Sequence, residues 1–114
     1  MHIDKSKKIQ NASSERRWKI RKTKGHDYAT EDILSNFKRM SCIMDAWNID
    51  IHTPHGVALF YACLKIDRLC NLVFSGKSPT NEPLQDTVDD LKNYIDLMEE
   101  CMIEVKLLED TYEE

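Results

Sequence analysis

Glycine, proline and long apolar runs are all scarce in this chain of 114 residues. Its three glycines and three prolines favour long helices over a fold rich in turns. No apolar run approaches the roughly 20 residues of a membrane span. The N-terminus opens with polar and basic residues, unlike a secretory signal. These absences predict a cytoplasmic protein that does not enter a membrane.

The sequence also lacks the usual pattern of a zinc site. No C-x-x-C pair is formed by the four cysteines, which are Cys42, Cys63, Cys70 and Cys101. Each falls on a predicted helix, so we expect free and mostly buried thiols. His52 and His55 flank Pro54 with no third ligand nearby, which favours a solvated loop over a metal site.

Charge is distributed unevenly along the chain. Residues 1–24 carry nine lysines and arginines against two carboxylates, whereas the other 90 residues carry seven against eighteen. The length is that of one domain, which we divide into a basic N-terminal arm or helix over 1–24 and a helical bundle over 25–114. The arm could contact nucleic acid or a membrane surface, but Trp18 is its only large aromatic residue. We therefore favour pairing of the arm with the acidic body, in the same chain or in a second copy.

Hydrophobic periodicity predicts four helices: Ser13 or Ser14 to Lys24, Glu31 to Trp47, Pro54 to Ser75, and Leu84 to Asp110. We expect Gly25 to end the first helix, Thr30 and Thr53 to cap the second and third, and Gly76 to end the third. The apolar stripe expected to form the core face of the second helix is Ile33 or Leu34, with Phe37, Met40, Met44 and Trp47. Four helices with short connections predict an all-α four-helix bundle, and the long apolar seam of the last helix predicts a homo-oligomer.

Polar side chains interrupt these apolar helices at helical spacing. Three pairs lie three residues apart and so share a helix face: Asn36 and Arg39, Lys65 and Arg68, and Asp90 and Asn93. Burying an unpaired charge costs several kcal/mol or more, so the grouping calls for a bound anion or metal. Arginine and lysine suit phosphate oxygens, whereas amides and carboxylates can orient a base or ribose. The pairs therefore predict a nucleotide site, with Tyr28, Phe37 and Tyr94 as stacking surfaces.

Two alternatives to this nucleotide site involve the carboxylates of the last predicted helix. Asp86, Asp89 and Asp90 could hold magnesium, which prefers oxygen ligands and bridges to phosphates. The same carboxylates could instead form ion bridges with Lys65 and Arg68, and basic pairs at this spacing are common on helices.

Four segments resemble a group of small bacteriophage proteins described as MazG-like. They read D-Y-A-T-E-D-I-L-S-N-F-K-R-M, T-P-H-G-V-A-L, L-K-I-D-R-L and D-T-V-D-D-L-K-N-Y, and the resemblance covers roughly residues 25–98. The positions that match the pattern of the group are Asp27, Tyr28, Asn36, Arg39, Lys65, Arg68, Asp86, Asp90 and Tyr94.

The resemblance implies a MazG-like helical fold, related to the all-α nucleoside triphosphate pyrophosphohydrolases, with magnesium and a dimeric or tetrameric assembly. Those hydrolases hold magnesium with E-x-x-E followed by E-x-x-D on the next helix. The corresponding helix here reads K-I-D-R, with Asp67 flanked by cations, and Ala29 replaces a glycine that is usual in the group. These departures favour binding of a phosphorylated nucleoside over its hydrolysis.

Three functions follow, in order of preference. The first is a phage-type protein, located in the host cytoplasm, that binds a nucleotide or nucleotide-derived signal and sequesters it against host defence. Arg39, Lys65 and Arg68 would contact phosphates, and Asp90 with Asn36 or Asn93 would orient the ligand. The second is a magnesium-dependent pyrophosphohydrolase with Asp86, Asp89 and Asp90 as metal ligands. The third is a module that binds a host protein and no small ligand.

Overall fold

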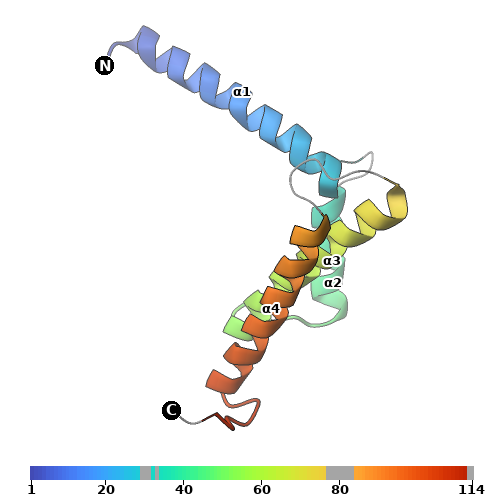
Figure 1. The fold of residues 1–114 in the computed structure, drawn as a ribbon. Helices are drawn as coiled ribbons and strands as arrows, with labels where there is room; N and C mark the ends of the chain where they lie inside the picture. The colour runs from blue at the N-terminus through green and yellow to red at the C-terminus, as the bar shows by residue number, and fades with distance from the viewer. Residues whose placement is uncertain (29–31, 33, 77–83, 113–114) are drawn as a thin grey trace.

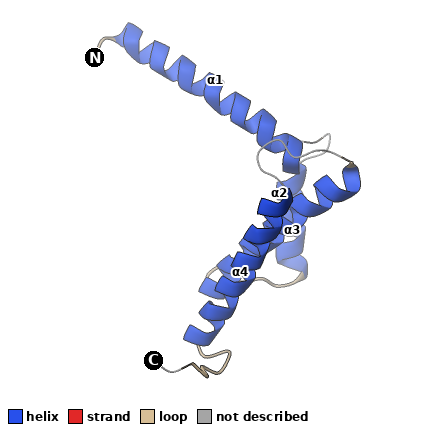
Figure 2. Cartoon of the chain, in the orientation of Figure 1, coloured by secondary structure: helices blue, strands red, loops and turns tan. Residues whose placement is uncertain are grey.

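The computed structural model describes residues 1–28, 32, 34–76 and 84–112, with the backbone alone described for 25–28. All regular structure in these ranges is helical (Figures 1 and 2). The helices are α1 (Ile3–Tyr28), α2 (Ser35–Ala46), α3 (Pro54–Ser75) and α4 (Leu84–Glu104). The predicted all-α class is confirmed. None of these helices combines the length and the apolar character needed to cross a membrane.

Helix α1 is longer at both ends than the sequence predicts. It begins at Ile3 and not near Ser13, because the segment before Ser13 consists largely of residues that readily form helices. It also continues through Gly25 to Tyr28, although a glycine inside a helix costs about 1 kcal/mol relative to alanine. The prediction that Gly25 ends the helix is therefore wrong, and the predicted loop that follows it is helical as far as the structure describes it.

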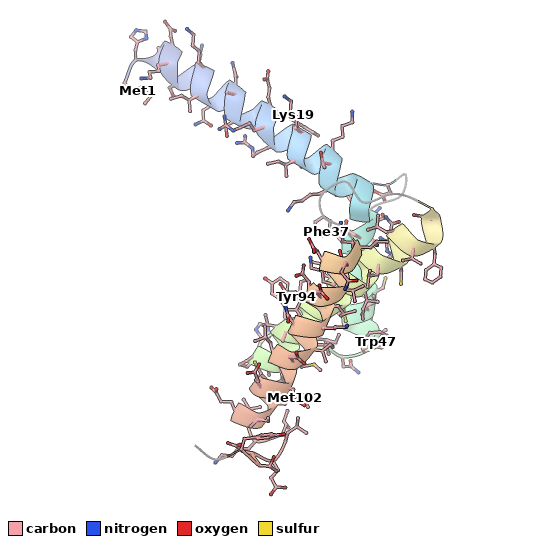
Figure 3. The ribbon with its side chains drawn as sticks, viewed as in Figure 1. Met1, Lys19, Phe37, Trp47, Tyr94 and Met102 are labelled. Atoms are coloured by element: carbon pink, nitrogen blue, oxygen red, sulfur yellow. The ribbon has the colours of Figure 1, made fainter. Side chains whose placement is uncertain are left out.

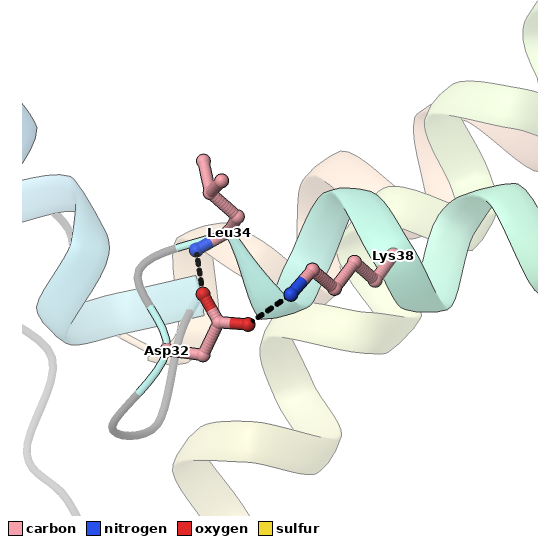
Figure 4. Close-up of polar contacts among 3 residues, drawn as sticks. All are labelled: Asp32, Leu34 and Lys38. Atoms are coloured by element: carbon pink, nitrogen blue, oxygen red, sulfur yellow. Dashed lines mark hydrogen bonds and ion pairs between the residues drawn. The ribbon is translucent and has the colours of Figure 1, made fainter.

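Helix α2 begins at Ser35, four residues after the predicted start. A carboxylate just before the helix organises this start, as Figure 4 shows. Asp32 accepts a hydrogen bond from the backbone N–H of Leu34 at 2.9 Å and from Nζ of Lys38 at 2.5 Å. The predicted cap, Thr30, lies outside the described residues.

Helix α3 has the predicted boundaries. The hydroxyl of Thr53 accepts a hydrogen bond from the backbone N–H of Gly56 at 3.1 Å, and Pro54 occupies the first turn. A Cβ atom on Gly56 would lie 1.7 Å from the carbonyl oxygen of Asp50, so only glycine fits there. At the other end Gly76 adopts a left-handed conformation, with φ of 75°.

Helix α4 ends at Glu104, before the predicted Asp110. Lys106 is left-handed, with φ of 64°, and its N–H donates to the carbonyl of Ile103 at 3.0 Å. The N–H of Leu107 donates to the carbonyl of Met102 at 2.8 Å. This pair of bonds is a Schellman motif, which ends a helix by reversing the chain. The sequence signal was weak because the left-handed residue is a lysine and not a glycine.

The helices form an open arrangement centred on α3. Helix α3 packs chiefly against α4 and more lightly against α1 and α2. Figure 1 shows α1 rising away from the other three helices, and Figure 3 places Met1 at its free end. The radius of gyration is 18.6 Å, compared with about 13 Å for a compact domain of this size. Most of α1 therefore stands outside the packed body.

Among the residues whose burial is described, the apolar core is small and consists of Met40, Ala58, Ala62, Cys63 and Leu72. Among the described members of the stripe predicted to form the core face of α2, only Met40 is buried, whereas Leu34, Phe37 and Trp47 are 47%, 67% and 64% exposed. The stripe prediction is wrong for those three residues because no described segment of the chain covers them. The expectation of mostly buried thiols also fails, since Cys42 and Cys70 are exposed.

Candidate functional site

A row of polar and aromatic pairs joins α3 to α4. The ring of Tyr61 stacks on that of Tyr94, with centroids 5.2 Å apart and planes 15° apart. One turn along, Nζ of Lys65 lies 3.3 Å from a carboxylate oxygen of Asp90. A step of four residues toward the C-terminus of α3, from Tyr61 to Lys65, matches a step of four residues toward the N-terminus of α4, from Tyr94 to Asp90. The two helices are therefore antiparallel. The predicted alternative of an ion bridge between these helices is confirmed for Lys65.

The same register continues to the most buried polar residues of the described part of the chain. Three residues beyond Lys65 is Arg68, and three residues before Asp90 is Thr87. Arg68 is 1% exposed and Thr87 is 0% exposed, and both have interaction partners within the chain. The α3–α4 row, defined here as Tyr61, Lys65 and Arg68 with Tyr94, Asp90 and Thr87, therefore lies in the helix interface.

A second ion pair joins α2 to α3. The guanidinium of Arg39 grips the carboxylate of Asp67 with two hydrogen bonds, Nε to Oδ1 at 2.5 Å and Nη2 to Oδ2 at 3.0 Å. The Asp67 side chain is 5% exposed, whereas that of Arg39 is 39% exposed. The hydrogen bonds with the carboxylate raise the pKa of Arg39. This bidentate geometry is the strong form of an arginine–carboxylate pair.

These contacts separate the three cations predicted to grip phosphate. Arg39 faces Asp67, Lys65 faces Asp90, and Arg68 is enclosed between helices. Arg39 lines a shallow hollow of about 460 Å³ beside Ile66 and Phe74, which Lys65 and Arg68 do not line. The three cations that were predicted to form one site therefore lie in different surroundings. Two of them, Arg39 and Lys65, contact carboxylates.

The other predicted site residues are also scattered. Asn36 is buried, Tyr94 stacks on Tyr61, and Asn93 is exposed. The side chains of Asp27 and Tyr28 lie outside the described residues. Asp86 and Asp89 are exposed on α4, and Asp89 accepts a hydrogen bond from Gln85. Within the described ranges, no three histidine, cysteine or acidic residues come together as a metal site.

A second, larger hollow lies where the C-terminal half of α1 meets α2 and α3. We name this hollow the α1 groove; its volume is about 870 Å³ and it is lined by Trp18, Lys19, Ile20, Arg21, Lys22, Lys24, Leu34, Asn36, Phe37, Met40, Phe60 and Leu64. Small-molecule sites usually measure about 300–1,000 Å³ and are mostly apolar with a few polar groups. The α1 groove has this size and this composition.

The lining of the α1 groove is divided by chemistry. Three aromatic residues and several aliphatic ones give it an apolar floor, while α1 contributes four cationic residues to the lining. The guanidinium of Arg21 lies 4.6 Å from the ring centroid of Trp18, in cation–π contact. Asn36 contributes an amide, and none of the described lining residues is acidic. The groove can therefore hold a flat aromatic group beside an anionic one.

Sequence reasoning missed most of this groove. It treated the cations of α1 as an arm and ended the first helix at Gly25, which separated Trp18 from Phe37. The available signal was Trp18 with Arg21 one turn later, followed by a stripe on α2 too apolar for a solvated face. Asp67 was also missed as a partner of Arg39, although a carboxylate on a largely apolar helix calls for a partner.

Comparisons of the chain with family models, with curated proteins and with solved structures give no match.

Proposed function

We propose that this chain binds a nucleotide or a nucleotide-derived signalling molecule in the α1 groove. The observation that supports the proposal is the juxtaposition, in the lining of one hollow of about 870 Å³, of three aromatic residues and four cationic residues. A nucleotide has the matching parts, a flat base and a phosphate. Asn36 was predicted from the sequence as a ligand residue and lines this groove.

Each part of the lining has a proposed role. Phe37 and Trp18 stack against the base, because aromatic rings bind every base through its π-face. Lys22 and Lys24 neutralise phosphate as compact, mobile charges, and Arg21 adds a planar fork. The amide of Asn36 pairs with the edge of the base, since it offers both donors and an acceptor.

The proposal replaces the predicted phosphate contacts of Arg39, Lys65 and Arg68 by those of α1. Binding without turnover is proposed because the described lining offers cations, an amide and apolar surface for holding an anion. A magnesium-dependent hydrolase is the less favoured function, since Asp90 contacts Lys65, and Asp86 and Asp89 are exposed and do not line the groove.

The MazG-like resemblance stays a prediction, as do homo-oligomerisation, a cytoplasmic location and a phage role. In that reading, sequestration of a nucleotide signal in the groove would counter a host defence. A pull-down of endogenous small molecules with the purified protein, followed by mass spectrometry, would identify the signal.

Isothermal titration calorimetry tests the proposed binding. The panel contains nucleoside mono-, di- and triphosphates, linear and cyclic dinucleotides, and an uncharged nucleoside. We expect saturable heat from a phosphorylated member and none from the nucleoside. Phe37→Ala should weaken binding by roughly tenfold or more, the value of one stacking contact. Trp47→Ala removes a similarly exposed aromatic side chain outside the groove and should leave the affinity unchanged.

Two results would reject the proposal. One is a panel in which no phosphorylated compound gives heat. The other is a ligand whose affinity falls equally in the Phe37 and Trp47 variants, which would place its binding outside the α1 groove.

A further inference from the structure

The outer segment of α1, residues 3–17, stands away from the rest of the chain. Figure 1 shows this end of the helix extending beyond α2, α3 and α4. Within it every described side chain is exposed or only half-buried. The α1 groove is lined from Trp18 onward, so the outer segment takes no part in the proposed ligand site. We expect a helix that extends this far into solvent to bind a partner, because isolated helices are only marginally stable in water.

The charge of α1 is opposite to that of α4. Residues 3–24 of α1 carry nine lysines and arginines against two carboxylates, whereas α4 carries seven carboxylates against one lysine. Within one chain α1 packs on α3, and α4 is not one of its substantial contacts. The two most oppositely charged helices of the molecule are therefore held apart in a single copy.

Each of these helices presents a face suited to the other. On α1, Lys5, Lys8 and Arg16 share one side with Ile9, and all four are exposed.

On α4, Asp89, Asp96 and Glu100 share one side, and all three are exposed. This side lies away from Thr87 and Tyr94, which face α3. At 1.5 Å per residue, the 26 residues of α1 and the 21 of α4 give similar lengths, about 39 and 32 Å.

We infer that the outer segment of α1 docks along the acidic face of α4 in a second copy of this chain. In a closed dimer, α1 of each copy would lie along α4 of the other, so that the dimer contains two identical contacts. Nucleic acid is the less suitable occupant. The segment itself carries Asp4 and Glu15, and residues 25–114, with seven basic and eighteen acidic side chains, repel a polyanion.

Sedimentation velocity over a concentration series tests this inference. The wild-type chain should self-associate, and added salt should weaken the association. Lys8→Glu with Arg16→Glu should raise the dissociation constant at least roughly tenfold, because like charges then meet across the interface. The matched control is Lys7→Glu with Arg17→Glu, which changes the net charge equally on other sides of α1 and should have a smaller effect.

A charge swap separates docking from misfolding. Asp96→Lys with Glu100→Lys on α4 should also dissociate the assembly, and mixing this variant with Lys8→Glu/Arg16→Glu should restore association through the swapped pair of faces. Circular dichroism checks that each variant keeps its helices. These substitutions lie outside the lining of the α1 groove, so nucleotide titration of the same variants reports separately on the proposed ligand site.

Three outcomes would overturn the inference. The wild-type chain could remain monomeric throughout the series. The control variant could dissociate as much as Lys8→Glu/Arg16→Glu, or the mixed variants could fail to associate. A monomeric chain that shifts a random-sequence DNA duplex, and loses the shift in Lys8→Glu/Arg16→Glu, would assign the segment to nucleic acid instead.

Discussion

The cations of α3 and those of α1 have the same chemistry but different surroundings. On α3, Arg68 is 1% exposed and Lys65 contacts Asp90, so these charges are enclosed within the α3–α4 interface. On α1, Lys22 and Lys24 line an open groove with no acidic residue in its described lining. A cation held in contact with a carboxylate contributes to the fold, whereas a cation beside an open apolar floor can meet a ligand. Whether a cation stabilises the fold or binds a ligand therefore depends on its burial and on the groups that contact it, and not on its residue type.

The largest effect on stability is expected from Arg68→Ala. The substitution empties a buried position and leaves the groups that contact Arg68 uncompensated, which should cost about 3–5 kcal/mol in the free energy of unfolding. Urea denaturation followed by circular dichroism measures the loss, with the exposed Lys92→Ala on α4 as control. A loss no greater than that of the control would mean that Arg68 is not part of the structural framework.

A smaller loss is expected when the pair of Arg39 and Asp67 is broken from one side. Asp67→Ala leaves Arg39 without its bidentate carboxylate, but the Arg39 side chain is 39% exposed and can turn toward water. We expect a loss of about 2 kcal/mol, measured by the same denaturation. Replacing both residues, as Arg39→Met/Asp67→Leu, should recover most of it because two apolar side chains fill the space without an unpaired charge. A double variant less stable than Asp67→Ala would contradict this reading.

The thiols distinguish the interior of the body from its surface by reactivity. Burial raises the pKa of Cys63, so less of its thiolate, the reactive form, is present at neutral pH. Labelling with iodoacetamide, followed by mass spectrometry, should modify the exposed Cys42 and Cys70 first and Cys63 only at higher pH. Equal labelling of the three at neutral pH would show that the body opens readily.

The smallest effect concerns the exposed pair at the start of α2. The hydrogen bond from Lys38 lowers the pKa of Asp32, with a further contribution from the N–H of Leu34. A depressed carboxyl pKa adds stability above the unfolded value of about 3.8, and this is lost as the pH falls through the folded value. Lys38→Ala should move the pKa back toward the usual value in an NMR titration, with little change in melting temperature. An unchanged pKa would show that Lys38 does not hold this carboxylate.

The sequence predicts the boundaries of a helix correctly where residues with specific capping chemistry occur at its ends. Thr53, Pro54 and Gly76 fixed both ends of α3, because a hydroxyl cap, a proline in the first turn and a left-handed glycine each have a local cause. The start of α1 had no such signal, and its passage through Gly25 depends on flanking residues that outweigh one glycine.

The candidate site was harder to predict because spacing along a helix does not say what lies opposite. Arg39 and Arg68 could be placed on helix faces, but their surroundings depend on how α2, α3 and α4 pack. The antiparallel register that sets Lys65 against Asp90 could be considered only as one alternative. The α1 groove depends on where a long helix crosses the body, and no local pattern encodes that crossing.

The most direct test of the division between structural and ligand-binding cations is calorimetric titration of two double variants with the nucleotide that binds best. Lys22→Glu/Lys24→Glu reverses two charges of the α1 groove, and Arg39→Met/Asp67→Leu removes the pair between α2 and α3. We predict that the first variant loses binding at an unchanged melting temperature and that the second binds as the wild type does. Full affinity in the first variant together with lost affinity in a folded second variant would contradict the division and return the site to Arg39.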